Sequence, residues 1–131
     1  MSDTKKIMLV DDSKVSRLML KAIIENKFPE WQVLEAENAS DALKVSLYEN
    51  DNIDLITLDM NMPGTDGLTI APQLRGNCTQ AVIALLTGNM TEEVRAQAEK
   101  LGLLFIPKPI TEDKIVEFIN SYSASEGAKH A

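Results

Sequence analysis

The 131-residue sequence predicts an α/β fold, in which helices cover both faces of a parallel β-sheet. Five short apolar segments alternate with five amphipathic segments along the chain. Parallel strands need such crossovers, because the chain must return to the same end of the sheet before the next strand begins. Several of the apolar segments contain almost no polar residues, which is typical of strands buried on both faces. The length and the 44% hydrophobic content fit a single domain.

The predicted strands are short apolar runs that end at polar or helix-breaking residues. The clearest is the run before Asp59, which is followed at once by a turn rich in breakers, Met62-Pro63-Gly64. The five strands are expected over residues 6–10, 31–36, 53–58, 81–86 and 103–106.

The predicted helices follow segments with apolar residues at helical spacing, and most of them begin after a good N-cap residue. In the first helix the spaced apolar residues are Val15, Leu18, Met19, Ala22 and Ile23. The third contains Pro72, which removes a backbone donor, so we expect that helix to be short or kinked. The five helices are expected over about residues 14–26, 38–48, 67–74, 91–101 and 111–122.

The chain becomes small and polar from Ser123 onward. We therefore expect one domain over residues 1–123 and a flexible C-terminal tail over residues 124–131. The only histidine, His130, lies in this tail and is not expected to carry a phosphoryl group.

Right-handed crossovers leave few ways to arrange five parallel strands. The expected arrangement is the flavodoxin-like doubly wound sheet with strand order 2-1-3-4-5, a known order for such sheets. In this order the first and third strands are neighbours. Asp11 and Asp12, which follow the first strand, would then lie beside Asp59, at the end of the sheet where ligands bind in open α/β folds.

Charge and composition exclude several classes of protein. Thirteen basic and twenty acidic side chains give a net charge of -7, and the basic residues are scattered, so direct nucleic-acid binding is not expected. No run reaches the roughly 18 apolar residues of a membrane span, and the N-terminus has no secretory signal. The single Cys78 fits a reducing compartment. We therefore expect a cytoplasmic protein that does not insert into membranes.

Three aspartates at one end of a sheet repel one another and raise each other's pKa unless a positive charge lies between them. A hard divalent cation such as Mg²⁺ prefers oxygen ligands and commonly binds one or two carboxylates together with a phosphate. Lys108 and Thr87 end the fifth and fourth strands and would add a positive charge and a hydroxyl donor. Such a site suits phosphoryl transfer, with Asp59 as nucleophile and Asp11 and Asp12 as the metal-binding pair.

Taken together and in this order, these residues resemble the response-regulator receiver domain of two-component signalling, over about residues 6–122. The motifs that carry the resemblance are Val10-Asp11-Asp12-Ser13 with Arg17, Asp59-x-x-Met62-Pro63-x-x-x-Gly67, Leu86-Thr87-Gly88 and Lys108-Pro109.

The resemblance implies that Asp59 accepts a phosphoryl group from a partner histidine kinase. It implies that Asp12, Asp59 and the backbone carbonyl of Asn61 bind Mg²⁺, or Mn²⁺, while Asp11 acts mainly through water. Thr87 and Lys108 would contact the phosphoryl oxygens, and the bond between Lys108 and Pro109 would be cis.

The resemblance also implies a conformational switch. Thr87 would move toward the phosphoryl group and Phe105 would turn inward, which changes the surface of the fourth helix, fifth strand and fifth helix. This surface would bind a downstream protein, or the phosphoryl group would pass to a phosphotransfer protein. Asn61 and Asn89 are expected to adjust the dephosphorylation rate. The chain would then catalyse only its own phosphorylation and dephosphorylation.

Three other functions compete with this interpretation. A phosphatase of the haloacid dehalogenase type needs a second aspartate two residues after the nucleophile, where this chain has Asn61. A flavodoxin-like redox protein would bind flavin phosphate after the first strand, where Asp11 and Asp12 would repel it. The third is a receiver-fold protein-binding module that works without phosphorylation.

Overall fold

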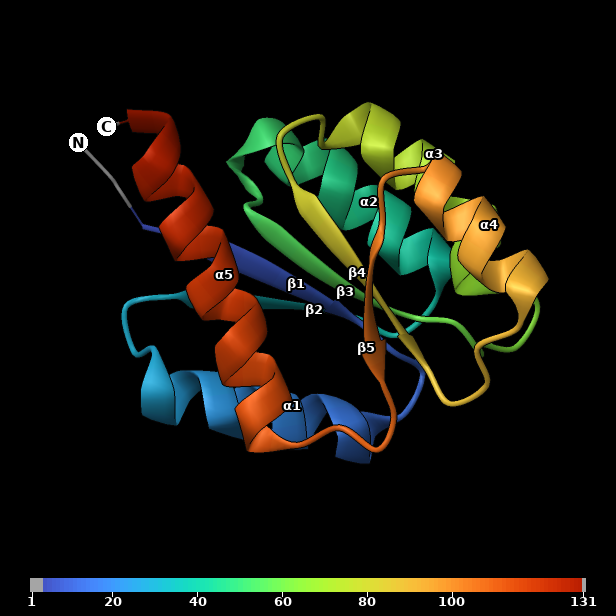
Figure 1. Ribbon diagram of the computed structural model, residues 1–131, viewed down its shortest axis with the longest axis horizontal. Helices are drawn as coiled ribbons and strands as arrows, with labels where there is room; N and C mark the ends of the chain where they lie inside the picture. Colours follow the sequence, from blue (N-terminus) through green and yellow to red (C-terminus); the bar gives the residue numbers. More distant parts are fainter. Residues whose placement is uncertain (1–3, 131) are drawn as a thin grey trace.

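A five-stranded parallel sheet forms the centre of the computed structural model, which describes residues 4–130 and the side chains of residues 4–122 (Figure 1). The strand order is β2-β1-β3-β4-β5, and every neighbouring pair is parallel, as the sequence predicted. The strands are β1 (Lys6–Val10), β2 (Gln32–Ala36), β3 (Leu55–Asp59), β4 (Val82–Thr87) and β5 (Leu104–Pro107).

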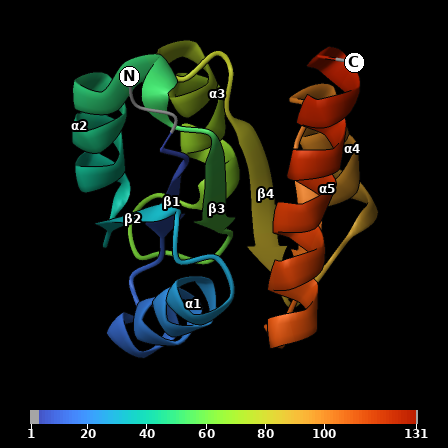
Figure 2. The same cartoon turned by 90° about the vertical axis from the view of Figure 1, so that its left-hand side faces the viewer.

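Helices cover both faces of the sheet. α1 and α5 lie on one face, and α2, α3 and α4 lie on the other (Figure 1); Figure 2 shows α2 and α1 on opposite sides of β1 and β2. The helices are α1 (Lys14–Lys27), α2 (Ala39–Glu49), α3 (Gly67–Asn77), α4 (Glu92–Lys100) and α5 (Glu112–His130), with a short 3₁₀ helix, η1 (Asn50–Asn52), before β3.

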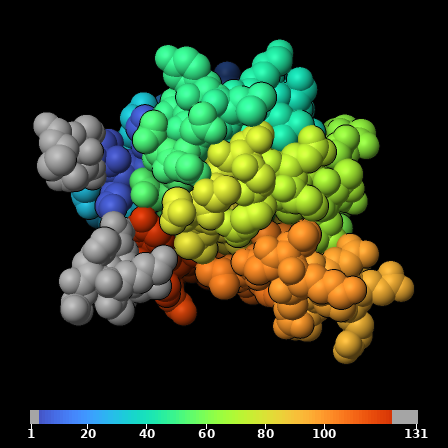
Figure 3. Space-filling model, turned by 90° about the horizontal axis from the view of Figure 1, so that it is seen from above, coloured from blue at the N-terminus to red at the C-terminus, as the bar shows by residue number. Residues whose placement is uncertain are grey.

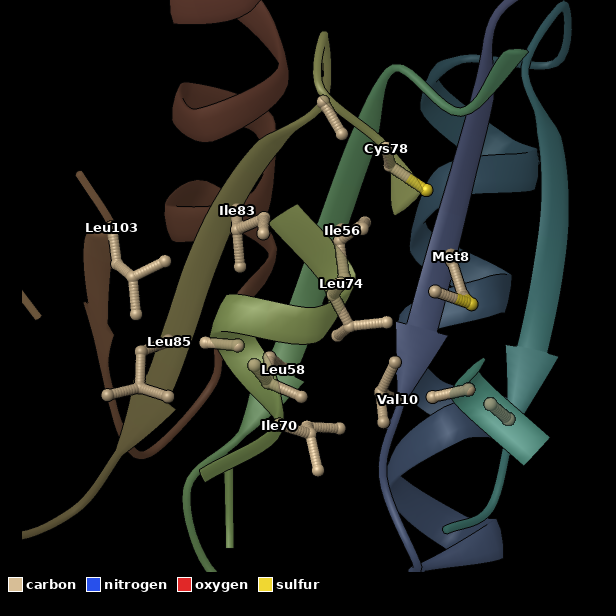
Figure 4. Close-up of a cluster of buried hydrophobic side chains, with 14 of the residues drawn as sticks. Met8, Val10, Ile56, Leu58, Ile70, Leu74, Cys78, Ile83, Leu85 and Leu103 are labelled. Carbon is tan, nitrogen blue, oxygen red and sulfur yellow. The ribbon is translucent and has the colours of Figure 1, made fainter. Parts of the chain in front are cut away.

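Alternating strand residues fill two separate core layers. In β1, Met8 and Val10 point toward α2 and α3, whereas Ile7 and Leu9 point toward α1 and α5. Figure 4 shows the first layer, in which Val10 lies near the β3 side chain Leu58. Full burial of one such aliphatic side chain contributes about 1.5–3 kcal/mol. These two layers fix the sheet and therefore the relative positions of its strand ends.

The loops that lead into β3 and β4 lie side by side at the end of the molecule seen in Figure 3. Asp51 of η1 accepts hydrogen bonds from both the backbone N–H and the hydroxyl of Thr79, at 3.0 and 2.9 Å. The carboxyl ends of the strands, where the candidate site lies, are at the opposite end of the sheet.

α1 forms where the sequence predicted it, but its buried face differs from the predicted apolar pattern. Its buried residues are Arg17, Leu20 and Ile24. Val15 and Leu18, two of the spaced apolar residues, are 77% and 53% exposed. The apolar spacing predicted the wrong buried face because a charged residue, Arg17, occupies one of the inward positions.

Two helices are longer than expected. α3 runs to Asn77 despite Pro72, which lies on the exposed side, where water can bond the carbonyl that proline leaves unpaired. α5 extends to His130, whereas the sequence prediction ended it at Tyr122. Its last turns, over residues 123–130, mix two alanines, a glutamate and a lysine with two serines and a glycine, and they carry no apolar periodicity. The boundary between domain and tail stays a prediction, since the side chains beyond residue 122 lie outside the described part.

Candidate functional site

Three aspartates converge at the carboxyl end of the sheet. Asp59 is the last residue of β3 and Asp11 follows β1; the two strands are paired directly, with Val10 opposite Leu58. One carboxylate oxygen from each of Asp11, Asp12 and Asp59 lies within 4.8 Å of the others. Asp11 and Asp59 are each only 3% exposed, and Asp12 is exposed. Ser13, not either aspartate, caps α1, so the acidic pair is not needed as a helix cap.

Asp11 is held on several sides. Its backbone N–H donates to the carbonyl of Ala36 at 3.0 Å, and its Oδ1 accepts from the N–H of Ser13 at 2.9 Å. Burial raises the pKa of Asp11 above its ordinary value of 3.8; the Ser13 bond lowers it in part, while neighbouring Asp59 adds to the rise. The site therefore holds more negative charge than its surroundings stabilise.

Lys108 supplies a positive charge at the centre of this cluster. Its Nζ donates to Oδ1 of Asp59 at 2.8 Å, and the N–H of Asn61 donates to the same oxygen at 3.2 Å. Both of these bonds go to Oδ1, and no hydrogen bond to the second carboxylate oxygen of Asp59 is seen among the described residues.

The loop that carries Lys108 is held at both ends. The backbone N–H of Lys108 donates to the carbonyl of Thr87 at 2.9 Å, and the Lys108–Pro109 bond is cis. In the first turn of α5, Lys114 Nζ donates to the carbonyls of Pro107 and Pro109, both at 2.8 Å. These contacts place the Lys108 side chain at the strand end, against Asp59.

Thr87 ends β4 at the same edge of the sheet and is 3% exposed. Its hydroxyl oxygen accepts from the N–H of Asn89 at 3.2 Å, and Asn89 itself is exposed. Phe105 lies on β5 opposite Leu85, two residues before the strand end, and is half-buried. The guanidinium of Arg95 lies 5.5 Å from the centre of the Phe105 ring. Phe105 is therefore beside the site rather than in it.

Three further residues shape the site through contacts that the sequence did not predict. Arg17 donates to the carbonyl of Asp11, and Lys114 holds the Lys108 loop. Gly67 begins α3 so close to the carbonyl of Asp59 that a Cβ there would lie 2.6 Å from that oxygen. The breaker-rich turn indicated Gly67, whereas nothing in the sequence pattern indicated the carbonyl contacts of Arg17 and Lys114.

This donor set fits a hard divalent cation. Three carboxylates supply oxygen ligands, and one ion pair, that of Lys108 with Asp59, joins a lysine to this cluster among the described residues. The residues that could hold the ion are Asp11, Asp12 and Asp59 together with the backbone carbonyl of Asn61. Such an arrangement can bind an anionic phosphoryl group between a cation and a lysine.

Comparison with known proteins identifies a family for this arrangement. A family model described as response regulator receiver domain matches residues 7–120. The chemotaxis protein CheY of Bacillus subtilis (strain 168) is 34% identical over 117 residues, which cover 88% of this chain and 94% of that protein. The cyclic di-GMP phosphodiesterase response regulator RpfG of Xanthomonas campestris pv. campestris (strain 8004) is 38% identical over 107 residues, but these cover only 28% of that protein.

Solved structures share the same fold. A CheY-like receiver domain protein from Methanospirillum hungatei JF-1 has a TM-score of 0.85 at 22% identity, covering 98% of this chain and all of that one. A response regulator from Burkholderia pseudomallei, solved with a phosphorylated aspartic acid, a calcium ion and citrate, has a TM-score of 0.79 at 26% identity, covering 97% of this chain and 73% of that one. No helix among the described residues is long and apolar enough to cross a membrane. The chain belongs to the response regulator receiver domain family.

Proposed function

We propose that this receiver domain is the phosphoacceptor of a cytoplasmic two-component relay, in which Asp59 takes a phosphoryl group from the phosphohistidine of a histidine kinase. The observation that carries the proposal is the position of Asp59. It ends β3 nearly buried, lies within 4.8 Å of two other carboxylates, and accepts a hydrogen bond from Lys108 at 2.8 Å. Two further carboxylates beside a purely structural aspartate would only add repulsion, which raises the free energy of the folded state.

The reaction would be an in-line displacement at phosphorus. The second carboxylate oxygen of Asp59 forms the new oxygen–phosphorus bond as the phosphorus–nitrogen bond to the donor imidazole breaks. The electron pair of the broken bond returns to the imidazole, whose other nitrogen carries a proton, so a neutral histidine leaves. Lys108 stays hydrogen-bonded to Oδ1 and can contact the arriving phosphoryl oxygens, and the Thr87 hydroxyl is the second donor at the same strand end.

The acidic cluster would hold Mg²⁺, and Mn²⁺ suits the same ligands. Asp12, Asp59 and the Asn61 carbonyl would be direct ligands, and Asp11 would act through water. The bound cation supplies positive charge that lets an anionic carboxylate approach an anionic phosphoryl group. The phosphorylated aspartic acid and calcium ion in the related Burkholderia pseudomallei structure support both parts of this proposal.

Phosphorylation would change the surface formed by α4, β5 and α5. A groove of about 580 Å³ lies there, with Phe105 in its wall. Inward movement of Thr87 and Phe105 would reshape this groove and shift an existing equilibrium between two conformers. A downstream protein would bind the reshaped surface, or a phosphotransfer protein would take the phosphoryl group from Asp59. The exposed side chains of Asn61 and Asn89 flank the site and would set water access, and with it the dephosphorylation rate.

The first test is incubation of the full chain with Mg²⁺ and acetyl phosphate, followed by intact-mass measurement. We expect one added phosphoryl group in the wild type, none in Asp59→Asn, and none in wild type with a chelator. Asp66→Asn is the matched control, because Asp66 is a partly exposed cap of α3 and asparagine caps equally well. An unmodified wild type would favour the phosphate-independent binding module, and a phosphorylated Asp59→Asn would place the acceptor elsewhere.

A further inference from the structure

We infer that Arg17 is a positioning residue for the metal-binding loop, an inference that rests on the proposed function. Arg17 is only 9% exposed. Its Nη1 donates to the backbone carbonyl of Asp11 at 2.6 Å, and its Nε donates to Oε1 of Glu35 at 3.0 Å. The side chain thus connects α1 to the loop after β1 and to the end of β2.

The burial of the Arg17 guanidinium is unfavourable by itself, because burying a charge costs free energy unless the charge is paired and hydrogen-bonded. Arg17 lies on the same face of α1 as Leu20 and Ile24, which are fully buried. An apolar side chain there would pack against the core without this cost. What the arginine adds is a hydrogen bond from a fixed, planar donor group to a loop carbonyl.

The contact matters because a peptide unit is planar. The carbonyl of Asp11 lies in the same plane as the nitrogen and Cα of Asp12, so a bond that holds the carbonyl also fixes Asp12. The Asp12 side chain is exposed, and no hydrogen bond to it is seen among the described residues, so its direction depends on the backbone. The Asp11 backbone is thus held at two points, its N–H by Ala36 and its carbonyl by Arg17, while Ser13 bonds its carboxylate.

Positioning and electrostatics predict opposite effects for loss of Arg17. The guanidinium is a positive charge near a proposed cation site, so removing it through charge alone would strengthen Mg²⁺ binding. Loss of a carbonyl contact that orients ligands would weaken it, and removal of such outer contacts typically costs about 10–100-fold in metal affinity. The direction of the change therefore separates the two explanations.

The chain contains a matched control for the charge. Lys21 lies one turn further along α1, with its Nζ 3.6 Å from Oε2 of the same Glu35. Lys21 forms no hydrogen bond or ion pair with Asp11. Lys21→Ala therefore removes a positive charge beside Glu35 and leaves the carbonyl bond in place.

The test is the Mg²⁺ dissociation constant of the full chain, measured by isothermal titration calorimetry, with circular dichroism as a check on folding. We expect about 10–100-fold weaker binding in Arg17→Ala. Lys21→Ala should stay within about twofold of wild type, and Arg17→Lys, which keeps one donor for the carbonyl, should recover part of the loss. Arg17→Met, which fills the space with an apolar side chain, should show the same loss as Arg17→Ala and replaces it if that variant does not fold.

Equal or tighter binding in Arg17→Ala or Arg17→Met would overturn the inference and leave the proposed metal site standing. A loss of the same size in Lys21→Ala would also overturn it, since the effect would then not depend on the bond to the Asp11 carbonyl. Absence of Mg²⁺ binding in the wild type would overturn the metal site and this inference together.

Discussion

Asp11 is the residue at which the conflict between folding and function is greatest. Its carboxylate is buried beside two other acids, and burial raises its pKa above 3.8. Ionising such a group costs the folded state free energy that the unfolded state does not pay. The cost is full above the folded-state pKa, declines as the pH falls through it, and is gone below 3.8, where the carboxyl is mostly protonated in both states.

Asp11→Asn should therefore raise the melting temperature of the metal-free protein at pH 7. The gain should shrink as the pH is lowered toward 4, since the wild type loses its penalty there. Asparagine keeps an oxygen that can accept the Ser13 bond, so the change tests charge rather than geometry. Thermal melts in a chelator at several pH values measure this. A lower melting temperature for Asp11→Asn at pH 7 would contradict the assignment.

The same melts with saturating Mg²⁺ provide a control. Binding to the folded state stabilises the wild type by an amount that grows with the logarithm of its Mg²⁺ affinity, and Asp11→Asn should gain less.

Cys78 shows a second effect of burial. The side chain is fully buried, its Sγ lies 3.8 Å from the Ser46 carbonyl, and burial raises its pKa to about 11. At pH 8 only about one thiol in a thousand would be the reactive thiolate, even before access is considered. We expect a thiol reagent at pH 8 to label the native chain far more slowly than the chain in denaturant. Equal rates would show that this part of the core opens readily.

At the residue scale, the site was largely predictable where polar residues end apolar strands. Asp11, Asp59, Thr87 and Lys108 all occupy such positions, and parallel strands bring their ends to one edge. Arg17 could not be predicted in its buried role, because a charged residue on an amphipathic helix is expected to face solvent.

At the element scale, α3 sits against the phosphoacceptor strand through a glycine. A Cβ on Gly67 would lie 2.6 Å from the Asp59 carbonyl oxygen and 3.0 Å from Leu85 Cδ1. Gly67→Ala must therefore push α3 away from β3, and such overpacking costs about 1–3 kcal/mol. Urea unfolding of the variant measures this loss.

Gly76 is the matched control in the same helix. A Cβ there would meet nothing within 4 Å. Gly76→Ala should leave stability unchanged or raise it by up to about 1 kcal/mol, because alanine favours a helix. An equal loss in both variants would mean that close packing of Gly67 on Asp59 is not the cause.

The existence and order of the elements followed from periodicity, whereas their faces and ends did not. α1 exposes Val15 and Leu18 to solvent and buries Leu20 and Ile24. The helix has apolar residues on two sides, and the side that carries Arg17 packs against the sheet. The C-terminal turns of α5 have no apolar period, so hydrophobic pattern gave no sign of them.

At the scale of the whole molecule, the strand order creates the site. The order β2-β1-β3-β4-β5 places β1 and β4 on either side of β3, so Asp11 and Thr87 approach Asp59 from opposite sides. The opposite end of the sheet is closed by loop contacts such as Asp51 with Thr79. Strand periodicity alone does not determine this order. The right-handed crossover rule leaves few orders, and the flavodoxin-like order is a known one for such sheets.

The most direct test of the central claim is to locate the phosphoryl group. The chain is treated with acetyl phosphate and Mg²⁺, reduced with borohydride, which converts an aspartyl phosphate to homoserine, and sequenced by tandem mass spectrometry. Reduction at position 59 alone is the predicted result. Reduction at Asp11 or Asp12, or at no residue, would contradict the account.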